Sequence, residues 1–143
     1  MSRLGTRKSP SGPKVSLQLP FYLSQPTTAT TNFVALSTVS NDPTEALCQY
    51  RIPVPGKLDT LLVNNNPVGA NAVNVTYQVR KNGADVGDPV VIANNAAGPV
   101  KAQLDDVAVL AGDLISIECA AGAFGGAAPM SRIELTWTPN GSV

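Results

Sequence analysis

Apolar and polar residues alternate along most of the chain after residue 14, a pattern typical of β-strands that bury one face. The clearest example is Val73–Arg80, where three valines and Tyr77 share one face while Asn, Thr, Gln and Arg share the other. Asn82-Gly83 follows and is typical of the two-residue turn whose twist matches a pair of antiparallel strands. The stretch therefore predicts a β-hairpin that returns through Ala84–Ile92.

The same reasoning predicts further short strands bounded by Gly, Pro, Asn or Asp. They are Val15–Leu19, which Pro20 should end, Phe33–Val39, Ala46–Ile52 with Cys48 and Tyr50 inward, Gly56–Val63, Val100–Leu104 or Asp106–Leu110, Asp113–Cys119 and Arg132–Trp137. No segment has helical periodicity, and about eight evenly spaced strands are typical of a β-sandwich or barrel. The expected core residues are Val75, Tyr77, Val79, Ile115, Ile117, Ile133, Leu135 and Trp137.

Composition indicates a single domain with a largely uncharged surface, preceded by a basic arm. Only 14% of the 143 residues are charged, against about 25% on average. Residues 1–14 hold four basic residues and no acid, so the rest of the chain has six of the ten basic residues and all ten acids. This arm is either a solvated tail or a segment that orders on a partner. Without interleaved aromatic residues, it favours an acidic protein surface over nucleic acid.

The residues of common catalytic and metal sites are missing or scattered. The chain has no histidine, which removes the commonest general base and metal ligand. Asp105-Asp106 are expected in a turn, and Asp113 is expected to bond nearby backbone amides. Asp85 and Asp88 could help to hold calcium, but their spacing does not match an EF-hand loop. We therefore predict no enzymatic activity, no cofactor and no metal.

Three other features narrow the class of protein. Cys48 and Cys119 each lie in an apolar run and are predicted to be small buried residues, with a disulfide between them as the alternative. No apolar stretch is long enough to cross a membrane, and the N-terminus lacks the apolar region of a secretory signal. The Gly/Ala-rich segment Ala120–Met130 is either a solvated loop or a subunit contact anchored by Phe124.

Three phrases carry a resemblance to a known group of proteins. They are "IPVPGKLDTLLV", "VTYQVRKNGADVG" and "VAVLAGDLISIEC". In this order they resemble the jelly-roll domains of tailed-bacteriophage structural proteins, which share their shape with tumour-necrosis-factor-like trimeric heads. The resemblance covers about residues 45–138. It implies an all-β fold, a single jelly-roll sandwich of about eight antiparallel strands with an extended N-terminal arm. The expected division is an arm at 1–20, the jelly roll at 21–139 and a tail at 140–143.

The resemblance also implies a role. In a small chain with a basic arm it implies a homotrimeric capsid decoration (cement) protein of the virion, made in the host cytoplasm. Such a protein binds the outer surface of the head and ties major capsid subunits together, often through its arm. The residues expected to contact the major capsid protein are Arg3, Arg7, Lys8 and Lys14, with Phe124 a candidate for a further subunit contact. Neither nucleic acid nor a membrane is an expected partner.

The alternative is a receptor- or carbohydrate-recognition head of a tail fibre or spike. Fibre-tip members of the group usually carry a long shaft before the head, whereas only about 20 residues precede the predicted β-body here. A sugar site generally needs an exposed aromatic platform, and the chain has one Trp, three Tyr and three Phe, several of them in phase with the core. The sequence therefore favours decoration over recognition.

Overall fold

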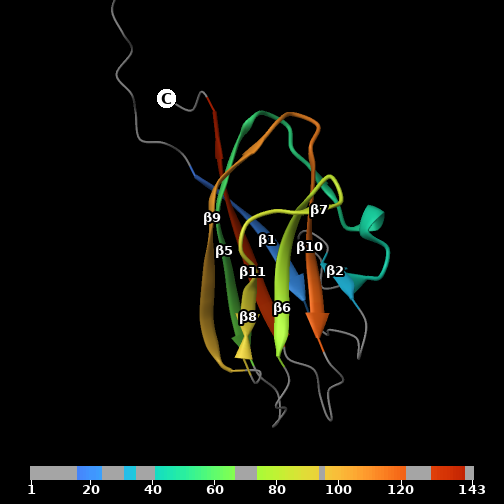
Figure 1. Ribbon diagram of the computed structural model, residues 1–143, viewed down its shortest axis with the longest axis vertical. Coiled ribbons are helices and arrows are strands. Elements are labelled where there is room, and N and C mark those ends of the chain that lie inside the picture. Colours follow the sequence, from blue (N-terminus) through green and yellow to red (C-terminus); the bar gives the residue numbers. More distant parts are fainter. Residues whose placement is uncertain are drawn as a thin grey trace, which may run out of the picture.

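The computed structural model describes a β-sandwich of two antiparallel sheets that face each other (Figure 1). It describes residues 16–23, 31–34, 41–66, 74–93, 96–121 and 130–140. These segments contain strands and the 3-10 turn η1 but no α-helix. The all-β prediction is therefore confirmed at the level of a β-sandwich.

The strands of sheet A are longer than most of those of sheet B. Sheet A has the order β1-β11-β5-β9, and sheet B has the order β3-β2-β10-β6-β7, with β4 added to β10 and β8 added to β6. The strands of sheet A are β1 (Leu17–Leu23), β5 (Gly56–Asn66), β9 (Gly98–Val109) and β11 (Met130–Pro139). Those of sheet B are β2 (Asn32–Val34), β3 (Asn41–Asp42), β4 (Tyr50–Arg51), β6 (Val75–Lys81), β7 (Ala84–Asp85), β8 (Val90–Ile92) and β10 (Leu114–Ala121). The 3-10 turn η1 (Glu45–Leu47) precedes β4.

The strand pairs are nested along the chain. β1 pairs with β11, β2 with β10, β5 with β9 and β6 with β8, and all four pairs are antiparallel. The pairs β1–β11 and β5–β9 lie in sheet A, and the pairs β2–β10 and β6–β8 lie in sheet B. From β8 onward, each of these strands therefore pairs with an earlier strand in reverse order. Strands that are far apart in the sequence, such as β1 and β11, consequently lie side by side.

The core fills the space between the sheets. It is built by every second residue of each strand, whose side chain points toward the other sheet. In β6 the inward side chains are buried and those between them are partly exposed. All eight side chains predicted for the core are buried and belong to one apolar cluster, so this prediction is confirmed. Removal of this apolar surface from water is the main term that stabilises the two sheets against each other.

Trp137 lies at one end of the core, with its indole against Gly56. The register of β11 shifts just before Trp137, which places Pro139 opposite Gly56. A Cβ on Gly56 would lie 2.6 Å from Trp137 Nε1 and would also collide with the carbonyl oxygen of Thr138. Glycine is therefore required at this position because no side chain fits between the two strands.

The predicted strand Ala46–Ile52 is wrong, because most of it does not pair with another strand. Its beginning forms η1, and only β4 pairs with β10. The Thr44 backbone N–H donates to Asp42 Oδ1 at 2.7 Å, and the N–H of Cys48 donates to the Glu45 carbonyl at 2.9 Å. Such local bonds, to an Asp side chain and within the backbone of a turn, compete with strand pairing.

Pro20 does not end the first strand, contrary to the prediction. β1 continues to Leu23 and pairs with β11 along its whole length, with Pro20 opposite Glu134. Because β1 is an edge strand of sheet A, a residue without an N–H is tolerated where it faces away from the partner strand.

The acidic pair Asp105-Asp106 lies inside a strand, so its predicted position in a turn is wrong. The two alternative strands predicted for this region are parts of the single strand β9. Both aspartates have a positive φ of 53°, and the pairing of β9 with β5 skips from Gln103 to Val107. The pair therefore forms a bulge, which lets one long strand follow the curvature of the sheet.

The outer edge of β9 carries three features that oppose further strand pairing. One is the Asp105-Asp106 bulge, and another is Pro99, which has no N–H to donate. The third is Lys81, whose Nζ donates to the backbone carbonyl of Ala108 at 3.0 Å. Natural sheets use bulges, prolines and lysines in this way at their edges.

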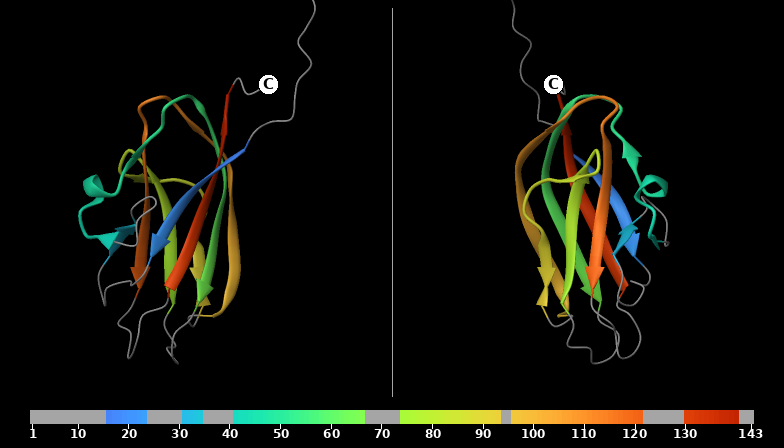
Figure 2. Two further views of the ribbon diagram at one scale, coloured as in Figure 1. Left: turned by 180° about the vertical axis from the view of Figure 1, so that it is seen from behind. Right: turned by 45° about the vertical axis from the view of Figure 1, so that its right-hand side comes forward.

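Several turns gather at one end of the sandwich, which we call the arm end because β1 begins there (Figure 2). They are the β6–β7 turn at Asn82-Gly83, the β9–β10 turn at residues 110–113 and the loop at residues 53–55. Asn82 and Gly83 have φ values of 52° and 80°, so the predicted hairpin turn is confirmed. The residues before β1 therefore join the body at this end.

Candidate interaction surface

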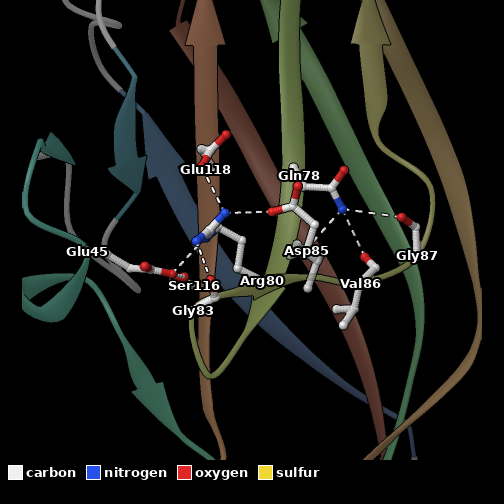
Figure 3. A network of polar contacts seen from close by, with 10 residues as sticks. Glu45, Gln78, Arg80, Gly83, Asp85, Val86, Gly87, Ser116 and Glu118 are labelled. Atoms are coloured by element: carbon white, nitrogen blue, oxygen red, sulfur yellow. Dashed lines mark hydrogen bonds and ion pairs between the residues drawn. The ribbon is translucent and has the colours of Figure 1, made fainter.

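The outer face of sheet B carries a compact charged cluster around Arg80 (Figure 3). Arg80 Nε lies 2.9 Å from Glu45 Oε1, and Nη1 lies 2.6 Å from Asp85 Oδ1 and 3.2 Å from Glu118 Oε2. Its Nη2 also donates to the carbonyl of Gly83. The side chains of Arg80 and Glu45 are each 19% exposed. One guanidinium therefore meets carboxylates from three separate segments in a partly desolvated place.

The cluster holds η1 against sheet B. Ser116 Oγ donates to Glu45 Oε1 at 2.7 Å, so this carboxylate accepts bonds from both β6 and β10. Cys48 Sγ donates to the Phe33 carbonyl at 3.3 Å, which fixes the other end of the segment on β2. The Arg80 guanidinium also lies 5.8 Å from the centre of the Phe33 ring, within the range of a cation–π contact.

The protonation states of this cluster favour a lasting ion pair. Burial, the largest single influence, raises the pKa of Glu45, but hydrogen bonds from Ser116 and Arg80 and the charge of Arg80 together lower it below its ordinary value. The hydrogen bond to Glu45 is the main reason that the pKa of Arg80 is raised. Both groups therefore remain charged at neutral pH.

The arrangement around Arg80 is suited to holding η1 on sheet B rather than to catalysing a reaction. Ser116 is buried and points its hydroxyl at a carboxylate that Arg80 already neutralises. Activation of a serine needs a base with a free lone pair and an oriented partner. Within the described segments, no three His, Cys, Asp or Glu side chains come together in a way that could hold a metal ion.

A second polar chain crosses the core and joins the two sheets. The Tyr77 hydroxyl donates to Ser131 Oγ at 2.9 Å, Ser131 Oγ donates to Asn65 Oδ1 at 2.7 Å, and Asn65 Nδ2 donates to the Ala96 carbonyl at 2.9 Å. Burial is the main cause that raises the pKa of the Tyr77 hydroxyl. Because each polar group in the chain has a partner, the chain helps to fix the register between the sheets.

Both cysteines are free and buried, which confirms the prediction and removes the disulfide alternative. Cys119 belongs to the core cluster, and burial raises the pKa of its thiol to about 12. Cys48 lies outside that cluster, in the segment that packs on Phe33. Cys48 is therefore buried as predicted, but outside the core between the two sheets.

Five large apolar side chains are exposed in the described segments. They are Leu17 (42%), Leu47 (71%), Val54 (43%), Val91 (46%) and Leu110 (65%). Leu17 begins β1, Val54 is in the loop at residues 53–55 and Leu110 is in the β9–β10 turn, so these three belong to the arm end, whereas Leu47 is in η1 and Val91 is in β8. Three of the five therefore gather where the basic arm joins the body.

The sequence-predicted partner contacts are not placed by the structure. Arg3, Arg7, Lys8, Lys14 and Phe124 all lie outside the described residues and stay predictions.

Two of the described aspartates have defined local roles. Asp113 accepts a bond from the Leu110 backbone N–H at 2.8 Å, which confirms its predicted turn role. Asp85, considered for calcium, binds Arg80 instead. The Arg80 cluster was missed because two of its three acids, Glu45 and Glu118, are distant from Arg80 in the sequence. The one available signal was an arginine on the outward face of the clearest predicted strand.

No protein-family model matches the sequence, and a search of curated proteins finds no match. No helix in the described part of the chain is long and apolar enough to cross a membrane. The fold, the charge distribution and the exposed apolar residues therefore carry the functional proposal.

Proposed function

We propose that this protein is a non-enzymatic structural protein of a tailed-bacteriophage virion. It is a homotrimeric capsid decoration (cement) protein that binds the outer surface of the head and ties major capsid subunits together. The nested strand pairing is the observation that supports this best. Four antiparallel pairs divided between two sheets are the arrangement expected of a jelly roll, with β3, β4 and β7 as short additions.

The outer face of sheet A supports the homotrimer. An uncharged row crosses all four of its strands, because Gln18 pairs with Thr136, Thr136 with Thr60, and Thr60 with Gln103. Outside this row, the same face of sheet A carries an ion pair between Arg132 Nη2 and Glu134 Oε1 at 3.0 Å. The row itself can be buried against another copy without desolvating a charge, whereas Lys101, opposite Leu62 in the neighbouring row, has to stay outside the contact or meet an acid of the other copy.

A charge placed in this row should dissociate the trimer. We expect Thr136→Lys to reduce the solution mass from three times the 14.8 kDa chain to that of one chain. Light scattering coupled to size exclusion measures this mass. Thr76→Lys, which makes the same change on a partly exposed position of β6 in sheet B, should leave the mass unchanged. A trimer that survives Thr136→Lys, or a wild-type monomer, contradicts the assigned interface.

The basic arm should be required for docking on capsids. Deletion of residues 1–14 removes four positive charges and should abolish retention on heads that lack the protein, while the circular dichroism of the β-body stays unchanged. Retention of the full chain should also weaken as salt rises, because exposed ion pairs are screened. Unchanged retention of the deleted chain on heads would contradict this role for the arm.

The copy number per particle tests the function itself. Quantitative mass spectrometry against the major capsid protein should give a simple ratio between the two proteins. A few copies per particle would instead favour a tail, fibre or vertex position and the recognition alternative. The described aromatic side chains do not favour a sugar site, because Phe33, Tyr77 and Trp137 are buried and Tyr50 packs against the core.

A further inference from the structure

The segment between β3 and β4, residues 43–49, lies on the outer side of sheet B, and we call it the strap. In the described part of the molecule, the core cluster includes none of its side chains. No residue of η1 is buried, and Leu47 is 71% exposed. The one buried side chain of the strap is Cys48, which is 4% exposed and lies outside the core. The core between the two sheets therefore stays complete when the strap is lifted.

Side-chain hydrogen bonds fasten the middle of the strap to sheet B. Glu45 Oε1 accepts from Arg80 Nε at 2.9 Å and from Ser116 Oγ at 2.7 Å (Figure 3). Cys48 Sγ donates to the Phe33 carbonyl at 3.3 Å. At the ends of the strap, β3 and β4 each pair with a neighbouring strand through two residues. A segment with so few buried apolar contacts opens at a lower free energy than the whole protein unfolds.

The surface under the strap is polar, so opening exposes groups that water can satisfy. Ser116, which is 1% exposed, and Arg80 both donate to Glu45 in the closed strap, and water can replace these bonds when it opens. Arg80 keeps its ion pairs with Asp85 and Glu118, which belong to sheet B. Opening therefore leaves no buried charge of this cluster without a partner.

The strap has hydrogen bonds of its own that opening does not break. The Leu47 N–H donates to the Thr44 carbonyl at 3.1 Å, and the Cys48 N–H donates to the Glu45 carbonyl at 2.9 Å. The Thr44 N–H donates to Asp42 Oδ1 at 2.7 Å. Because these bonds lie within the segment itself, the strap can move as a unit.

We propose that the strap opens from sheet B as a unit while the sandwich stays folded, and that the contact between Glu45 and Arg80 sets how often it opens. Opening brings the Cys48 thiol into contact with solvent. Cys119, which belongs to the core, is reached only when the two sheets separate. This inference does not depend on the proposed function, because it follows from contacts within one chain.

The two cysteines of the chain report the two kinds of opening separately. The full chain is treated with a maleimide reagent at constant neutral pH, and the modification of each cysteine is followed by mass spectrometry of its peptide. Each rate is divided by the rate of the same cysteine in the denatured chain. We expect Cys48 to be modified at least roughly tenfold faster than Cys119 on this scale.

Two matched variants test the role of the Glu45 contact. The side chains of Glu45 and Glu118 are 19% and 24% exposed, and both contact Arg80, but Glu118 belongs to β10 and keeps this contact in the open strap. Glu45→Gln should raise the rate of Cys48 modification roughly tenfold, because a hydrogen bond between charged groups is lost from the closed state alone. Glu118→Gln should leave that rate unchanged.

A core variant separates opening of the strap from unfolding of the sandwich. Ile133→Val removes a buried methyl group from sheet A and should raise the rate of Cys119 modification several-fold. It should leave the Cys48 rate unchanged, since the core is intact in both the closed and the open strap.

Three results would overturn the inference. Equal rates for Cys48 and Cys119 in wild type mean that the strap opens only when the protein unfolds. An equal rise of both rates in Ile133→Val has the same meaning. If Glu45→Gln does not raise the Cys48 rate, or if Glu118→Gln raises it equally, the contact between Glu45 and Arg80 does not set the opening.

Discussion

Alanine at position 56 is expected to lower the free energy of unfolding by about 3 kcal/mol. The added methyl would meet Trp137 Nε1 at 2.6 Å and the Pro139 Cα at 2.9 Å, and the backbone of β11 cannot move without disturbing sheet A. Denaturant unfolding followed by tryptophan fluorescence measures the loss, since Trp137 is the chain's single tryptophan.

Gly112→Ala is the control for this substitution. Gly112 has a φ of +93° and open space around it, so alanine there adds only backbone strain of about 1–2 kcal/mol. The packing argument requires the loss at Gly56 to exceed the loss at Gly112. Equal losses would mean that β5 and β11 can separate at this point at little cost.

Replacement of Arg80 by leucine should destabilise the protein by about 3 kcal/mol, because the largely covered carboxylates of Glu45 and Glu118 would lose their shared counter-charge. Asp85 adds little to this loss, because its side chain is 61% exposed and water screens its charge. Thermal or denaturant unfolding measures the effect. The double variant Arg80→Leu/Glu45→Leu should lose less than the sum of the two single variants, because the acid left unpaired in the first is absent from the second. Strict additivity would contradict direct coupling between the two side chains.

The same cluster predicts a pH dependence of known sign. The pKa of Glu45 in the folded protein lies below its ordinary value of 4.5, so its ionised form is favoured by folding. Its contribution to stability is therefore fully present above that value and is lost as pH falls below it. The difference in unfolding free energy between wild type and Glu45→Gln should be largest near neutral pH and should shrink under acid conditions. A difference that grows on acidification would contradict the ion pair.

The sequence predicted those parts of the fold that depend on which side chains leave water. Alternation with period two identified β6 and β10 and their buried residues, because one face of each is covered along its whole length. The Asn82-Gly83 turn was also predictable, since its conformation depends on the two residues themselves. Burial and local backbone preference are both visible in a short window of sequence.

The errors arose where a distant partner decides the structure. Ala46 and Leu47 lie in η1 instead of a strand because the carboxylate of the neighbouring Glu45 reaches Arg80 and Ser116 on two other strands. Pro20 is tolerated in β1 because that strand is at an edge, which depends on pairing with β11. Neither pairing can be inferred from neighbours along the chain.

The candidate surface was predictable only in part. The charge of the arm depends on residues 1–14 alone and can be counted directly from the sequence. Val54 and Leu110 were not singled out, because each is an ordinary apolar residue within a loop or turn. The pairing of Gly56 with Val109 and the hydrogen bonds between Ile52 and the β9–β10 turn bring them to the same end.

The edge of β9 determines how this protein behaves when it is concentrated. A second chain that tried to extend sheet A would need the carbonyl of Ala108, which Lys81 occupies, and an N–H at Pro99, which does not exist. The intervening bulge would also place its hydrogen-bonding groups out of step with a straight incoming strand. Fibrillar aggregation by strand addition along this edge is therefore disfavoured, so copies can be crowded together without joining through it.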